Sequence, residues 1–149
     1  MAAYAVEMNR TASTTASLGS IVADATRPRR GRWYDITHGS EASPADNAFR
    51  YIVQRCTAAG TSTAVTPQAL DPADAATESD AGENHTAEPT YTANAILLAV
   101  GLNQRATYRW VATPGRELVY PATASNGLGI QTPSAGTVAI TTTVHYVEE

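Results

Sequence analysis

The segment that decides the fold class lies near the end of the chain and reads Val138-Ala139-Ile140-Thr141-Thr142-Thr143-Val144-His145-Tyr146. Its large apolar side chains recur at every second position, and small or polar residues fill the positions between them. A period of two residues places successive side chains on opposite faces of a β-strand. Val, Ile and Thr also suit a pleated surface better than a helix. The segment therefore predicts a strand with one face toward a core.

The same pattern recurs upstream in shorter segments, and turn-forming residues separate them. The expected strands are Arg32–Ile36, Phe49–Cys56, Ala95–Val100 and Ala106–Val111. Dipeptides such as Pro114-Gly115 and Asn126-Gly127 are typical of the turns that join strands. Several short strands divided by such turns predict an all-β fold, either an antiparallel β-sandwich or a jelly-roll-like barrel.

The composition fits one domain with a thin core. Of 149 residues, only 24 are Leu, Ile, Val or Phe, whereas 28 are Ala and 21 are Thr. So few large apolar residues would suggest disorder if the net charge were high, but the formal net charge is only -4. The seven Tyr and two Trp therefore have to supply much of the buried area.

Missing residue types exclude several kinds of chemistry. All 10 basic residues are Arg, so a Schiff-base lysine and a P-loop lysine are impossible. The single Cys56 excludes an intramolecular disulfide and a cysteine-based zinc site. The longest apolar run, Ala95–Val100, is far shorter than the ~20 residues that cross a bilayer. We also expect no signal peptide and no membrane association.

Two regions depart from the alternating pattern. Residues 1–31 include the small, polar segment Ala12–Ala25, so we expect an extended N-terminal segment, either an arm or an edge strand. Residues 32–149 would then form the single β-sandwich domain. Within it, residues 61–91 hold six carboxylates and no Arg. This polar stretch predicts a long acidic loop at about 61–91.

A cluster of arginines supplies the candidate binding site. Arg27, Arg29, Arg30 and Arg32 fall within six residues, and guanidinium groups bind carboxylates and phosphates through paired hydrogen bonds. The alternative is a solvated loop that precedes a strand. Nucleic acid is not the expected partner, because the chain is acidic overall and its basic residues are not spread over one face.

Other polar groups are better explained without a ligand. His38, His85 and His145 are far apart in the sequence and lack the spacing of metal ligands. The carboxylates of Asp71–Asp74 and Glu78–Asp80 could bind calcium, but they lack an EF-hand pattern, and a solvated acidic loop is the better interpretation. No catalytic residue, metal site or cofactor is therefore expected, and we do not expect an enzyme.

Several stretches resemble one family of structural proteins. They are Arg105–Ile130, the strand at Val138–Tyr146, the terminal Glu148-Glu149, Arg32-Trp33-Tyr34-Asp35-Ile36, and Leu70-Asp71-Pro72-Ala73-Asp74. They resemble capsid decoration (cement) proteins of tailed bacteriophages with a β-sandwich fold, and the resemblance extends over about half of the chain. The resemblance rests on local strings, and that family has no universal functional residues to carry over.

The resemblance implies a function without catalysis. It implies a homo-oligomer, with a trimer favoured, that is made in the host cytoplasm and binds neighbouring major capsid protein subunits on the capsid exterior of the virion. Contact through the N-terminal region and Arg27–Arg32 would suit that role. The alternative is a carbohydrate- or receptor-binding β-sandwich module of a phage fibre or adhesin. That function would need exposed, coplanar aromatic side chains, whereas the simpler expectation is that the Tyr and Trp residues fill the core.

Overall fold

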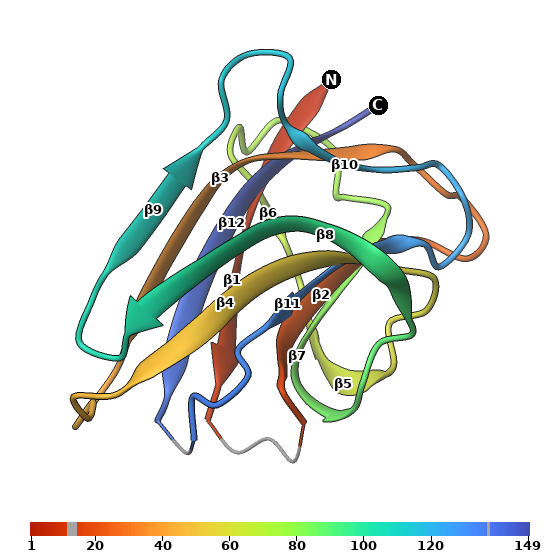
Figure 1. Cartoon of the computed structure of the whole chain (residues 1–149). Coiled ribbons are helices and arrows are strands. Elements are labelled where there is room, and N and C mark those ends of the chain that lie inside the picture. The colour runs from red at the N-terminus through yellow and green to blue at the C-terminus, as the bar shows by residue number, and fades with distance from the viewer. Residues whose placement is uncertain (12–14, 137) are drawn as a thin grey trace.

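The computed structural model describes residues 1–11, 15–136 and 138–149, and it confirms an all-β fold of two antiparallel sheets (Figure 1). The strands are β1 (Ala2–Arg10), β2 (Ser17–Ala23), β3 (Gly31–Ser40), β4 (Ala48–Cys56), β5 (Thr61–Val65), β6 (Gln68–Ala69), β7 (Ser79–Ala87), β8 (Tyr91–Asn103), β9 (Tyr108–Val111), β10 (Leu118–Tyr120), β11 (Gly127–Gln131) and β12 (Ile140–Glu148). In one sheet the order is β10-β3-β12-β1-β6, with β9 also paired to β3. In the other it is β5-β7-β2-β11-β4-β8.

The strand order is that of a jelly roll. Successive strands β1 to β4 alternate between the two sheets, and the later strands return beside them as the pairs β1–β12, β2–β11, β3–β9 and β4–β8. Two sheets connected in this way form a sandwich that shares one core. Strands β5, β6 and β7 lie between β4 and β8 in the sequence and extend both sheets on one side.

The expected C-terminal strand is confirmed as β12. Its burial alternates strictly from Ile140 to Glu148, with Val144 and Tyr146 buried and His145 half-buried. Strand β12 lies between β1 and β3 at the middle of its sheet. The aromatic residues fill the core as expected, because the side chains of Trp33, Tyr51, Tyr120 and Tyr146 are fully buried together with aliphatic neighbours.

The expectation of an N-terminal arm or edge strand over residues 1–31 is wrong. Strand β1 lies between β12 and β6, and β2 lies between β7 and β11, so both are inner strands. Every residue of β2 is buried. Its small residues allow this close packing: a Cβ atom at Gly19 would lie 2.5 Å from the Met8 sulfur. The part of the expected arm at residues 12–14 lies outside the described residues.

The expectation of a long acidic loop at 61–91 is also wrong over most of that range. Residues 61–65 and 79–87 pair with each other as β5 and β7, and the two residues of β6 pair with β1. The longest connection in that range is the exposed stretch around Asp71 and Asp74. The prediction failed because acidic residues that face outward on a strand give a segment the same composition as acidic residues on a loop.

Candidate functional site

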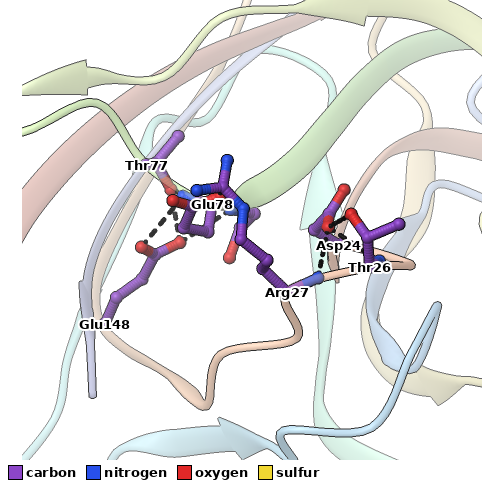
Figure 2. A network of polar contacts seen from close by, with 7 residues as sticks. Asp24, Thr26, Arg27, Thr77, Glu78 and Glu148 are labelled. Atoms are coloured by element: carbon purple, nitrogen blue, oxygen red, sulfur yellow. Dashed lines mark hydrogen bonds and ion pairs between the residues drawn. The ribbon is translucent and has the colours of Figure 1, made fainter.

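The arginine cluster lies on the connection between β2 and β3, at the end of the sandwich that carries both chain termini (Figure 1). Asp24 shapes this connection. Its carboxylate accepts hydrogen bonds from the Thr26 hydroxyl at 2.6 Å and from the backbone N–H groups of Thr26 at 2.8 Å and Arg27 at 2.6 Å (Figure 2). These bonds to the charged form lower the pKa of Asp24 to about 2. The loop therefore has a defined turn at its start.

Three of the four arginines bind carboxylates of this same chain. Arg27 lies 2.9 Å from Glu78 (Figure 2), and Arg30 lies 3.6 Å from Glu149. Arg32 lies 3.0 Å from Glu149 and 3.9 Å from Glu117. The positive patch expected from the sequence is therefore an alternation of both charges, and Arg32 sits at the start of β3 rather than on the loop.

Arg29 is the exception. Within the described ranges its guanidinium has no ion pair, and the residue is exposed. It lines an open depression of about 550 Å³ together with Met1, Tyr4 and Glu148, among others. The lining of this depression includes both a guanidinium and carboxylates, so a complementary partner would present groups of both charges or polar groups.

Glu148 binds the segment of the chain that leads into β7 at this end of the sandwich. Its carboxylate accepts hydrogen bonds from the Thr77 hydroxyl, from the Glu78 N–H at 3.1 Å and from the Ser79 N–H at 2.8 Å (Figure 2). The Thr77 hydroxyl also bonds the Tyr146 hydroxyl at 2.8 Å. Sequence reasoning missed this network, because it joins residues about 70 positions apart. Its one local signal was an acidic residue on the buried parity of the last strand.

The histidines do not form a site. His38 is buried between the rings of Phe49 and Tyr51, with ring centroids 5.6 and 4.6 Å away, and burial lowers its pKa to about 4. His85 is buried in β7. His145 on β12 stacks on Tyr34 of the neighbouring strand β3 at a centroid distance of 6.1 Å, and both belong to the sheet that does not contain β7. In the part of the chain that the structure describes, no group of three His, Cys, Asp or Glu side chains could hold a metal ion.

No aromatic residue is fully exposed on the surface. All ten are described, and each is either buried or half-buried. Tyr34, Tyr91, Tyr108 and Trp110 are the half-buried ones. Stacking on a sugar ring needs an accessible aromatic face, and only these four residues could present one.

Comparison with known proteins finds no matching family model, no matching curated protein and no matching solved structure. Within residues 1–11, 15–136 and 138–149 there is no helix that could span a membrane.

Proposed function

We propose that this chain is a structural virion protein that decorates and stabilises a bacteriophage capsid. In this role it binds major capsid protein subunits on the capsid exterior as a homo-oligomer, with a trimer favoured. Jelly rolls occur in viral capsid proteins and also in lectins, so this support from the fold is an analogy. The fold suits either class, and the surface has to distinguish them.

The observation that carries the proposal is the rigid, arginine-bearing end of the sandwich. Its turn is held by Asp24, and its neighbouring segment is held by Glu148, so the surface is ordered before a partner arrives. A surface that is already ordered loses little conformational entropy on docking. Arg27, Arg29 and Arg30 are exposed there. An exposed guanidinium can give up its ion pair with a carboxylate of its own chain and bind a carboxylate of a partner instead.

Co-sedimentation with phage heads that lack this protein tests the proposal. Purified chain is mixed with heads of the phage that encodes it, and the bound fraction is measured at increasing salt. We expect saturable binding that weakens as salt rises, and at least about tenfold weaker binding for the double variant Arg29→Glu/Arg30→Glu. The matched control is Arg109→Glu, which reverses an exposed arginine on β9, opposite Thr37 and away from the cluster, and should bind like the unchanged chain.

The outcomes separate the two parts of the proposal. Equal binding by the unchanged chain and the double variant would remove the arginine cluster from the docking surface. Absence of binding to heads at any salt concentration, with a folded chain, would overturn the decoration function itself.

A further inference from the structure

One side of the sandwich is open and the other is closed. On the closed side, β5 and β7 extend one sheet, β6 extends the other, and β5 and β7 contact β1 across the gap. On the open side, one sheet ends at β8 and the other at β9 (Figure 1). We call the side that carries β5, β6 and β7 the insertion side, and the side that ends at β8 and β9 the open side. An edge strand presents unpaired backbone N–H and C=O groups that can pair with another chain.

Apolar side chains lie along the open side, and its edge strand β8 carries no charged residue. Exposed Ile96 and Val111 lie on β8 and β9, with 43% and 57% of their surface accessible. Half-buried neighbours on the same two strands pack against the core from this side: Leu97, Leu98, Val100, Tyr108 and Trp110. No charged residue occurs from Tyr91 to Gln104, although natural edge strands are commonly guarded by charges. The pairing of β8 with β4 is regular over residues 98–103. No bulge therefore interrupts this half of the sheet edge, and a partner strand could pair with it.

The open side also carries unpaired arginines. Arg50 lies on β4 opposite Gly101, and Arg105 follows the end of β8 by two residues. Both are exposed, and within the described ranges neither side chain has an ion pair. The Arg105 side chain donates to the Pro44 carbonyl at 3.4 Å. In the same region, the Asp46 carboxylate accepts a 2.6 Å hydrogen bond from the Asn103 side-chain amide.

The insertion side has the opposite character. Asp71 and Asp74 are exposed beside Leu70, which has 50% of its surface accessible. Neither aspartate has an ion pair among the described residues. Leu70 follows β6 directly, and its N–H donates to the Ala3 carbonyl on β1. The exposed apolar residue and the free carboxylates therefore lie at the sheet edge farthest from β9.

We propose that copies of this chain associate head to tail, with the open side of one copy against the insertion side of the next. The contact joins Arg50 and Arg105 to Asp71 and Asp74 and covers Ile96, Val111 and Leu70. It supplies the surface for the self-association included in the proposed function, and in that respect it rests on that function. Arg50 is near the start of β4 and Arg105 bonds Pro44, so both lie away from the end that carries Arg29. A variant of these two arginines therefore tests self-association without changing the capsid-docking surface.

Charge favours this arrangement over a two-fold contact between open sides. A two-fold axis would bring the unpaired arginines of both copies toward each other, whereas the head-to-tail contact gives each of them a carboxylate. A head-to-tail contact buries a different surface on each partner, and it forms a ring when the rotation between copies closes. Because the two surfaces lie on opposite sides of the sandwich, successive copies form an open chain when that rotation does not close.

Sedimentation velocity on the full chain, without capsids, tests the contact. Three variants are compared with the unchanged chain: Arg50→Glu/Arg105→Glu, Asp71→Arg/Asp74→Arg, and the swap that combines all four. We expect the unchanged chain to self-associate as its concentration rises, and each double variant to associate at least about tenfold more weakly. The four-residue swap restores opposite charges across the contact, so it should recover self-association. An equimolar mixture of the two double variants should recover it as well.

The control is Arg29→Glu, which should leave self-association unchanged because Arg29, on the connection between β2 and β3, belongs to neither set of contact residues. All five residues are exposed, so melting curves of the dilute variants should match that of the unchanged chain. A monomer at all concentrations would overturn the inference. The inference would also be overturned if only Arg50→Glu/Arg105→Glu weakened self-association and the four-residue swap did not restore it. That result would indicate a two-fold contact between open sides. Either result leaves capsid binding by the Arg29 end to be decided by co-sedimentation.

Discussion

The carboxylate of Glu148 accepts a 2.8 Å hydrogen bond from the backbone N–H of Ser79, and this bond ties the two sheets together. Glu148 belongs to β12 in the middle of one sheet, and Ser79 begins β7 in the other. Both residues are buried. The connection that leads into β7 is therefore anchored on the strand that the sequence predicts most clearly.

Removal of this anchor should destabilise the protein. In Glu148→Ala, the N–H groups of Glu78 and Ser79 and the Thr77 hydroxyl all lose an acceptor, so we expect a loss of about 2–3 kcal/mol in the free energy of unfolding. Glu148→Gln keeps one oxygen and should lose less. Urea unfolding at neutral pH measures both. The control Glu149→Gln removes only partly exposed ion pairs and should cost no more than about 1 kcal/mol. Equal losses for Glu148→Ala and the control would contradict the anchor role.

His38 should make the stability depend on pH. Its pKa is about 4 in the folded protein because of burial, against about 6.5 in an unfolded chain. Between these values the unfolded state binds the proton and the folded state does not, so stability is complete above about pH 6.5 and falls as the pH drops toward 4. Over this window we expect a loss of about 3 kcal/mol. Below about pH 4 both states are protonated, and His38 contributes no further change.

The variant His38→Phe isolates this effect. Phenylalanine fits among the rings of Phe49 and Tyr51, although it gives up the contact of the His38 Nδ1 with the Thr142 hydroxyl at 3.3 Å. Chemical unfolding at intervals from pH 7 to pH 4 should show a shallower slope for the variant. Burial also lowers the pKa of His85, so a residual slope of the same sign should remain. An unchanged slope in His38→Phe would mean that His38 is not the titrating group.

Two strand glycines should respond to alanine with opposite signs. A Cβ atom at Gly127 would lie 2.2 Å from the Ile21 carbonyl oxygen, which is backbone and cannot turn aside. We expect Gly127→Ala to cost at least about 1–3 kcal/mol through overpacking. Gly101 has open space at its Cβ position, and alanine there should stabilise by about 0.5 kcal/mol because the unfolded chain loses freedom. Denaturant unfolding of dilute protein measures both changes, and a loss of stability in Gly101→Ala would contradict the prediction.

Cys56 should be unreactive until the protein unfolds. The thiol is buried, and burial raises its pKa to about 12, so almost no thiolate forms at neutral pH. A disulfide exchange reagent at pH 7.5 should label the folded chain no faster than the chain opens. In urea the labelling should become complete. Rapid labelling of the native protein would show that the region between β4 and β11 opens locally, since Cys56 pairs with Gly127 there.

The sequence predicts some strands well because only one face of each is covered. Strands β12 and β4 alternate between core and exposed or half-buried positions over much of their length, and they appear within two residues of the expected ranges. Strand β2 shows no alternation because both of its faces are covered, and a strand covered on both faces loses the period-two signal. Its small residues therefore suggested an arm, while the tertiary structure places it in the middle of a sheet.

The arginine cluster shows the same division. The sequence by itself determined the all-β class, the single thin core filled by Tyr and Trp, and the position of four arginines before a strand. Only the tertiary structure decided what surrounds those arginines. It brings Glu78, Glu117 and Glu149 beside them from other strands and connections. Local periodicity follows from the geometry of one strand, whereas these ion pairs depend on how the chain crosses between two sheets, and spacing along the chain carries no record of that path.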